Sequence, residues 1–157
     1  MNVDGKHYRT IWPARDGWQV VIIDQTLLPY EFKEVQLASL QDAAQAIAEM
    51  LVRGAPLIGA TTAYGVALAM HANSSDANLD QACEQLLQTR PTAVNLRWAL
   101  HEMRQALSAL PVEQREQAAY QRAAEICDDD VAMCSAIGDN GHMLIADLWE
   151  KANRQGR

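Results

Sequence analysis

The stretch VRGAPLIGATTAYGVALAM, residues 52–70, combines a tight turn with a long apolar run. Pro56 suits the opening position of a helix, because its fixed φ fits the helix and its missing N–H would have no partner there. The helix from Pro56 to about His71 is rich in Gly, Ala and Thr, so its neighbours can approach it closely. It is shorter than a membrane span, and we expect a buried helix.

The turn before this helix has the features of an anion site. Gly54 and Ala55 form the turn, where Gly54 lets the backbone come close to a ligand. Arg53 supplies a planar guanidinium that can bind two phosphate oxygens, and the start of a helix favours negative charge. The alternative is structural: Gly54 and Pro56 only end one helix and start the next, and Arg53 caps the carbonyls of the first helix.

A second arginine run, RPTAVNL at residues 90–96, repeats this arrangement. Thr92 can cap a helix that begins near Ala93, with Arg90 just outside it. Two such helix starts can share one phosphate. The alternative for Arg90 is a simple positive charge at the C-terminal end of the preceding helix.

The rest of the chain predicts an α+β fold that is mainly α. Short β-favouring runs before residue 38 indicate a small antiparallel sheet of three strands, and the pattern is helical from Ser39, which forms a capping box with Asp42. We therefore expect a sheet subdomain at 1–38 and a helical bundle at 39–157. The expected strands are 7–12, 18–24 and 31–37, and the remaining helices are 39–51, 79–88, 93–110, 111 or 112 to about 137, and 142–152, with a loop at 73–78 and a kink or break at 138–141.

Composition narrows the class of protein. The 157 residues suffice for one core and are too few for two ordinary domains. A net charge of −7 provides no basic stripe for nucleic acid, so no nucleic-acid partner is expected. The first residues lack the apolar segment of a secretory signal, and no membrane partner is expected. We predict a cytoplasmic protein.

The cysteines, histidines and acidic residues give no strong sign of a metal or redox site. Cys83, Cys127 and Cys134 lack CxxC spacing, so we interpret them as reduced thiols that act as small core residues. The four histidines are scattered, and three consecutive aspartates at 128–130 cannot converge on one ion from a helix. They are expected on a solvated face. Trp98 and Trp149 can be interface anchors, but core packing is the default expectation.

The two arginine runs together resemble one family, the S-methyl-5-thioribose-1-phosphate isomerases, whose superfamily includes the regulatory subunits of eukaryotic translation initiation factor 2B. The resemblance extends from about Trp18 onward. It also includes AYGVALA at residues 63–69, ICDDDV at 126–131 and IGDNG at 137–141.

This resemblance implies a function, and it implies that substrate binding and the chemical step belong to different domains. The complete enzyme would isomerise 5-methylthioribose 1-phosphate to 5-methylthioribulose 1-phosphate in methionine salvage, without a cofactor. Arg53, Gly54, Ala55 and Arg90 would bind this small sugar phosphate, through its phosphate. The family's catalytic cysteine and aspartate belong to a following α/β domain that has no counterpart here. We therefore expect an N-terminal part that is inactive alone, whether a truncated form, a split gene product or an interrupted reading frame.

Two alternatives stay open at this point. A related isomerase of the ribose-1,5-bisphosphate type would use the same phosphate cradle. A non-enzymatic regulatory subunit of the initiation-factor type would use the helical domain as an interaction module, although the pair of arginine runs favours an enzyme. Helices that pack on a missing domain expose apolar surface, so we also expect a homo-oligomer or poor solubility.

Overall fold

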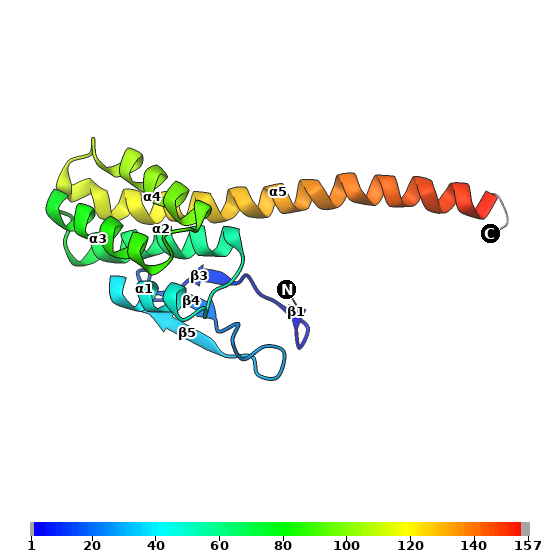
Figure 1. Cartoon of the computed structure of the whole chain (residues 1–157), viewed down its shortest axis with the longest axis horizontal. Coiled ribbons are helices and arrows are strands. Elements are labelled where there is room, and N and C mark those ends of the chain that lie inside the picture. Colours follow the sequence, from blue (N-terminus) through cyan, green and yellow to red (C-terminus); the bar gives the residue numbers. More distant parts are fainter. Residues whose placement is uncertain (1, 155–157) are drawn as a thin grey trace. The chain divides into compact units, whose positions relative to one another are not determined.

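The computed structural model describes residues 2–154 and confirms an α+β fold that is mainly helical (Figure 1). Short strands come first and helices follow. In chain order the elements are β1 (Asn2–Val3), β2 (Lys6–His7), β3 (Ile11–Pro13), β4 (Val20–Ile23), β5 (Glu34–Leu37), α1 (Leu40–Ala48), α2 (Ala55–Ala72), α3 (Asp76–Thr89), α4 (Val94–Leu107) and α5 (Val112–Arg154).

The chain divides into two compact units, one up to Ala124 and one from Glu125 onward, and α5 runs through both. The predicted division into a sheet subdomain at 1–38 and a bundle at 39–157 stays a prediction. Among residues 2–154, no helix combines the length and apolar character needed to cross a bilayer.

The predicted three-stranded antiparallel sheet is present, with the order β3-β4-β5. Ile22 pairs with Ile11 on one side and with Val35 on the other. A separate hairpin of β1 and β2 was not predicted. The sequence feature that indicates this hairpin is the pair Asp4-Gly5, since such pairs favour the tight turn of a two-residue hairpin. Both residues have a positive φ.

Helix starts follow the capping residues of the sequence. The hydroxyl of Ser39 accepts the Asp42 N–H at 3.1 Å, which confirms the predicted cap of α1. At α3 the prediction was wrong, because the helix begins at Asp76 and not at residue 79. Ser75 caps it by accepting the Asn78 N–H at 3.3 Å, so half of the expected loop at 73–78 is helix.

Helix α2 is the buried helix that the sequence predicted, with every residue from Leu57 to Met70 out of solvent. It packs against α1, α3 and α4. A Cβ placed on Gly65 would lie 3.1 Å from the Cβ of Ala43 and 3.2 Å from Cδ2 of Leu86. The small residue at this position therefore lets α1 and α3 approach α2 closely, as expected from the composition of the helix.

Helix α5 is continuous, so the predicted kink or break at 138–141 is wrong. Each glycine costs a helix only about 1 kcal/mol relative to Ala, and no proline interrupts this stretch. The expected core packing of Trp98 and Trp149 is also wrong, since both side chains are exposed. Cys127 is buried as expected, whereas Cys134 is exposed.

Within the first unit, the start of α5 is fixed by polar contacts. The hydroxyl of Tyr120 donates to the carbonyl of Trp18 at 2.6 Å. The indole of Trp18 stacks on His71 with ring centroids 4.5 Å apart, and Nδ1 of His71 lies 2.6 Å from a carboxylate oxygen of Glu116. These contacts connect α5 to the end of α2 and to the turn between β3 and β4.

Tyr120 makes the free energy of unfolding depend on pH in the alkaline range. Burial raises the pKa of Tyr120 to about 12, above the usual value of about 10 that applies when the chain is unfolded. The stability that this group contributes is complete below pH 10 and is lost as the pH rises through 12. We expect Tyr120→Phe to cost about 1 kcal/mol at pH 7 and to flatten the decline between pH 10 and 12.

Urea unfolding at neutral and alkaline pH measures this effect. Tyr30→Phe is the matched control, because Tyr30 is 96% exposed. We expect that control to keep the alkaline decline of the unsubstituted protein. An equal decline in Tyr120→Phe would contradict the prediction.

Candidate functional site

A pocket of about 490 Å³ lies where α2 and α4 begin. It brings together all four residues predicted to bind the ligand: Arg53, Gly54, Ala55 and Arg90. The two arginine runs, separated by α2 and α3 in the sequence, therefore meet at one site. The other lining residues are Met50, Ile58, Thr92, Ala93, Val94 and Asn95.

The turn into α2 depends on Gly54. Its φ is +91°, a conformation that other residues rarely adopt, and a Cβ placed there would meet nothing within 4 Å. Backbone conformation therefore requires this glycine, and the space beside it is open to a ligand. Ile58 N–H donates to the Gly54 carbonyl at 3.0 Å, which closes the first turn of α2. Pro56 is the second residue of this helix.

The turn into α4 differs from the prediction. Ala93 occupies the N-cap position and no side chain caps the helix, so the expected cap by Thr92 is wrong. Backbone contacts shape the turn, because Ala93 N–H donates to the Arg90 carbonyl at 3.0 Å. Arg97 Nη1 also donates to the Pro91 carbonyl at 2.7 Å.

The two helices that begin at the pocket share this lack of a side-chain cap. Helices α1 and α3 are capped by the hydroxyls of Ser39 and Ser75. The first N–H groups of a helix have no partner within the helix. At α2 and α4 these donors, together with the positive end of each helix dipole, are available to an anion.

Gly59 explains why the two helix starts lie close together. A Cβ placed on Gly59 would lie 3.2 Å from the backbone oxygen of Asn95, so α2 and α4 nearly touch beside the pocket. Asn95 also lines the pocket, and its amide can both donate and accept hydrogen bonds. Asn95 belongs to the RPTAVNL run, but its residue type and position did not predict it as a site residue.

The guanidinium groups of Arg53 and Arg90 are not used within the fold. No hydrogen bond or ion pair joins either group to another residue of 2–154, although Arg90 is half-buried. The Arg53 side chain therefore does not cap the carbonyls of the helix before it. Arg90 occupies the C-cap position of α3, so its alternative role as a positive charge at the end of that helix stays open. Two positive charges line the pocket beside two uncapped helix starts.

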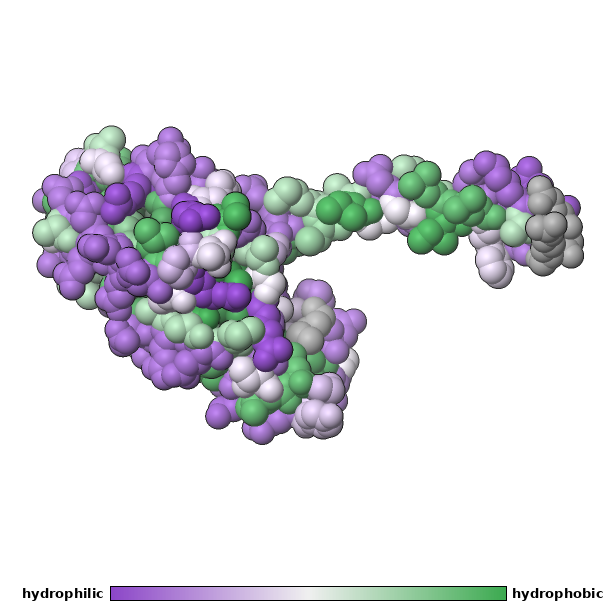
Figure 2. Space-filling model, in the orientation of Figure 1, coloured by the Kyte–Doolittle hydropathy of each residue, from purple (hydrophilic) through white to green (hydrophobic). Residues whose placement is uncertain are grey.

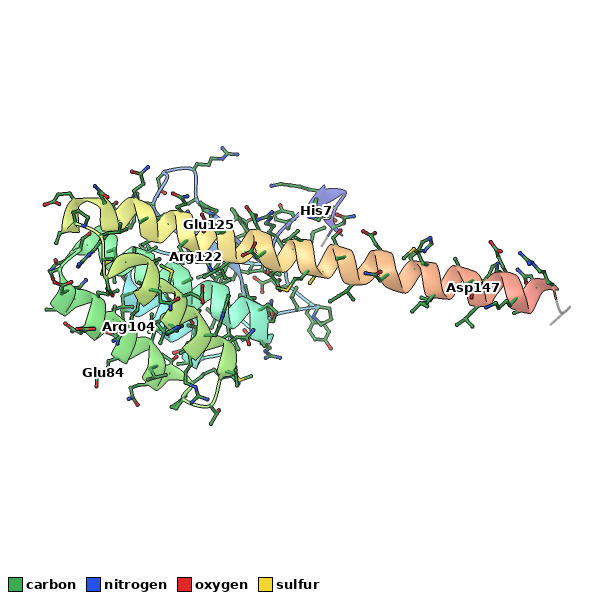
Figure 3. The ribbon with its side chains drawn as sticks, turned by 90° about the horizontal axis from the view of Figure 1, so that it is seen from above. His7, Glu84, Arg104, Arg122, Glu125 and Asp147 are labelled. Carbon is green, nitrogen blue, oxygen red and sulfur yellow. The ribbon has the colours of Figure 1, made fainter. Side chains whose placement is uncertain are left out.

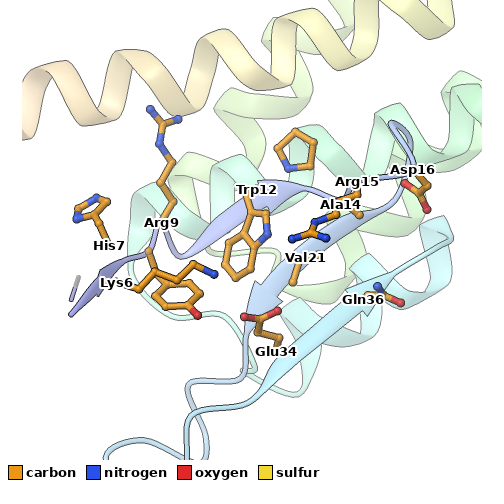
Figure 4. Close-up of a pocket in the computed structure, with 12 residues that line it drawn as sticks. Lys6, His7, Arg9, Trp12, Ala14, Arg15, Asp16, Val21, Glu34 and Gln36 are labelled. Carbon is orange, nitrogen blue, oxygen red and sulfur yellow. The ribbon is translucent and has the colours of Figure 1, made fainter. Parts of the chain in front are cut away.

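A larger hollow of about 730 Å³ lies on the three-stranded sheet (Figure 4). Trp12, Val21 and Gln36, which are in register on neighbouring strands, line it. Basic and acidic side chains line this hollow side by side. Nζ of Lys6 also lies 4.4 Å from the centre of the Tyr8 ring. This mixture of charges gives no clear preference for an anion.

A third hollow lies between α3 and α4 and contains the buried Cys83. Arg104 reaches it from α4, with Glu84 on the neighbouring helix (Figure 3). Burial raises the pKa of the Cys83 thiol, and the hydrogen bond from Arg104 only partly opposes this. The buried position confirms the expectation of a core cysteine, and the raised pKa makes the thiol a poor nucleophile.

A match over most of the helical part of the chain identifies the family. A profile of the "Initiation factor 2 subunit family" matches residues 51–150, which contain both arginine runs. The chain belongs to the initiation factor 2 subunit family. The resemblance inferred from the motifs is thereby confirmed.

Within this family the similar proteins include isomerases. The methylthioribose-1-phosphate isomerase of Paramagnetospirillum magneticum is 58% identical over 154 residues, which are 98% of this chain and 42% of that protein. The chain spans about two fifths of the length of the curated isomerases it matches.

Two solved structures have a similar fold. The 5-methylthioribose 1-phosphate isomerase of Pyrococcus horikoshii OT3 has a TM-score of 0.71 and 38% identity, over 80% of this chain and 37% of that one. The translation initiation factor eIF-2B subunit delta from A. fulgidus has a TM-score of 0.72 and 32% identity, over 80% and 38% of the two chains. Fold alone therefore does not separate an isomerase from an initiation factor subunit.

Proposed function

We propose that this chain is the N-terminal, substrate-binding part of a cytoplasmic methylthioribose-1-phosphate isomerase. Arg53 and Arg90 hold the phosphate of 5-methylthioribose 1-phosphate between them, and the first N–H groups of α2 and α4 bind its remaining oxygens. No cofactor takes part. The chemical step belongs to a following domain, as the resemblance implies.

One observation carries this proposal: two arginines without partners in the described chain line one pocket with two uncapped helix starts. Each guanidinium can donate two parallel hydrogen bonds to a phosphate. This pair of arginines favours an enzyme over a regulatory subunit. The curated isomerases that match nearly the whole of this chain support the same substrate class.

A chimaeric enzyme tests the proposal. Residues 1–157 are joined to the rest of the Paramagnetospirillum magneticum relative, which is 58% identical over the shared part. We expect this chimaera to convert 5-methylthioribose 1-phosphate to 5-methylthioribulose 1-phosphate. We expect no turnover above buffer from residues 1–157 alone, because a bound phosphate supplies orientation without proton transfer.

The full-length relative is the positive control, and ribose 1,5-bisphosphate is the competing substrate. A folded chimaera that acts only on the bisphosphate would indicate the related isomerase. A folded chimaera without activity on either sugar would favour the regulatory function. Turnover by residues 1–157 alone, free of contaminating enzyme, would contradict the proposal that the chemical step belongs to a following domain.

A further inference from the structure

Met50 combines an unfavourable backbone conformation with an exposed apolar side chain. Its φ is +63°, and Asp4 is the only other residue besides glycine that has a positive φ among residues 2–154. Such a conformation is uncommon outside glycine, and Asn and Asp adopt it more readily than other residues do. A non-glycine residue that keeps it points to a function of its side chain.

Met50 stands where helix α1 ends. Glu49 is the C-cap of α1, so Met50 is the first residue beyond the helix. Its N–H donates to the Ile47 carbonyl at 3.3 Å, and the Val52 N–H donates to the Ala46 carbonyl at 3.4 Å. Glycine is the usual residue at this position, because it has no Cβ to clash in the left-handed conformation. The backbone of this turn therefore favours glycine, and the methionine needs another reason.

Core packing does not explain the methionine. Ile47 and Val52, on either side of the turn, are fully buried, whereas Met50 is 42% exposed. Figure 2 shows that hydrophilic side chains cover most of the visible face of the first unit, so an exposed apolar side chain is an exception there. The side chain of Met50 lines the pocket at the starts of α2 and α4, three residues before Arg53.

This pocket has an apolar part beside its charged part. Its larger apolar side chains are Met50, Ile58 and Val94. Ile58 is buried, whereas Val94 is 69% exposed, so Met50 and Val94 offer apolar surface to a ligand. Phosphate and hydroxyl groups gain nothing from such surface, because polar groups removed from water need hydrogen-bond partners. The pocket therefore fits a ligand that has both an anionic group and an apolar group.

We propose that Met50 determines which sugar phosphate this pocket accepts, an inference that rests on the proposed function. The phosphate binds Arg53 and Arg90. The thioether of Met50 contacts the apolar substituent at C5 of the sugar, which is the methylthio group in 5-methylthioribose 1-phosphate. Methionine is flexible and polarisable, so it adapts to a small thioether. A second phosphate at C5 would lie against apolar surface and lose its hydration there.

Kinetics of the chimaeric enzyme with two substrates test this contact. 5-Deoxyribose 1-phosphate has a hydrogen in place of the methylthio group, so the ratio of the two kcat/KM values measures recognition of that group. We expect Met50→Gly to lower this ratio about tenfold, because a small change in apolar contact produces discrimination of that order. The kcat/KM for the deoxy sugar should change little.

Two further variants separate the effect of the side chain from that of the backbone. Met50→Leu keeps an apolar side chain of similar volume and should retain most of the substrate ratio. Met50→Asn keeps a residue that tolerates a positive φ but makes the side chain polar. We expect it to lower the ratio as Met50→Gly does.

Urea unfolding of the 157-residue chain gives an independent measurement. Met50→Gly should raise the midpoint of unfolding, because glycine adopts the left-handed conformation without strain. The same variant is thus expected to stabilise the fold and to weaken substrate discrimination. Asp4→Gly is the matched control, since Asp4 also has a positive φ but does not line the pocket. It should leave the substrate ratio unchanged.

The outcomes distinguish this inference from the proposed function. A folded, unsubstituted chimaera that is inactive on 5-methylthioribose 1-phosphate would overturn the proposed function, and the inference with it. An active chimaera whose substrate ratio Met50→Gly leaves unchanged would overturn the inference alone. A lower midpoint of unfolding for Met50→Gly would show that Met50 serves packing and would equally contradict the inference.

Discussion

Replacement of both Arg53 and Arg90 by Ala is expected to lower kcat/KM of the chimaeric enzyme about a thousandfold. Each guanidinium contributes charge-assisted hydrogen bonds worth roughly 1.5–3 kcal/mol, and 1.4 kcal/mol corresponds to a factor of ten. Circular dichroism and thermal unfolding show whether the variant is folded. Arg15→Ala removes an exposed arginine outside this pocket and is expected to change kcat/KM little.

Arg53→Lys separates charge from geometry. Lysine keeps the positive charge but loses the planar pair of donors, so substrate binding should weaken by roughly 1–3 kcal/mol. If the arginines only stabilise helix ends, their substitution would change stability with little effect on affinity. An Arg53→Lys chimaera with unaltered KM and kcat would contradict the shared-phosphate proposal.

Arg115→Ala is expected to lower the free energy of unfolding by about 3 kcal/mol. The side chain is 5% exposed and lies 2.7 Å from the Asp76 carboxylate. It also donates to the carbonyls of Leu110 at 3.0 Å and of Ser74 at 3.1 Å. One guanidinium thus joins the start of α5 to two loops and to α3, and its loss leaves these acceptors without their charged donor.

Asp76→Asn is the matched variant for Arg115, because it removes the ion pair and keeps the bonds to the carbonyls. The Asp76 side chain is 80% exposed, so we expect a cost below about 1 kcal/mol. Urea unfolding of both variants measures the difference. A cost for Asp76→Asn equal to that for Arg115→Ala would show that the ion pair, and not the carbonyl contacts, carries the effect.

The part of the fold that local signals determine was predictable. Ser39 marked a helix start, and the apolar run after Pro56 marked a buried helix. Ser75 gave the same kind of signal, but the polar residues around it suggested a loop. The glycines at 138 and 141 suggested a break that the helix does not make, because their cost is small beside that of an interrupted helix.

The candidate site was predicted in part, for a physical reason. Arg53 and Arg90 stand in recognisable turns, and helix starts favour anions wherever they occur. Asn95 gave no such signal, because its position at the pocket depends on contacts between elements distant in sequence. The close approach of α2 and α4 at Gly59 comes from tertiary packing, which a single sequence does not display.

The uncapped starts of α2 and α4 link the proposed phosphate site to the stability of the fold. A bound anion would cap the starts of α2 and α4, as the hydroxyls of Ser39 and Ser75 cap α1 and α3. The ligand would then stabilise the fold. Stability then rises with ligand concentration, because binding only to the folded chain shifts the unfolding equilibrium. Ala93→Ser would raise the free energy of unfolding of the ligand-free protein, because a serine hydroxyl can cap α4. The same hydroxyl would compete with the ligand for the first N–H groups of this helix.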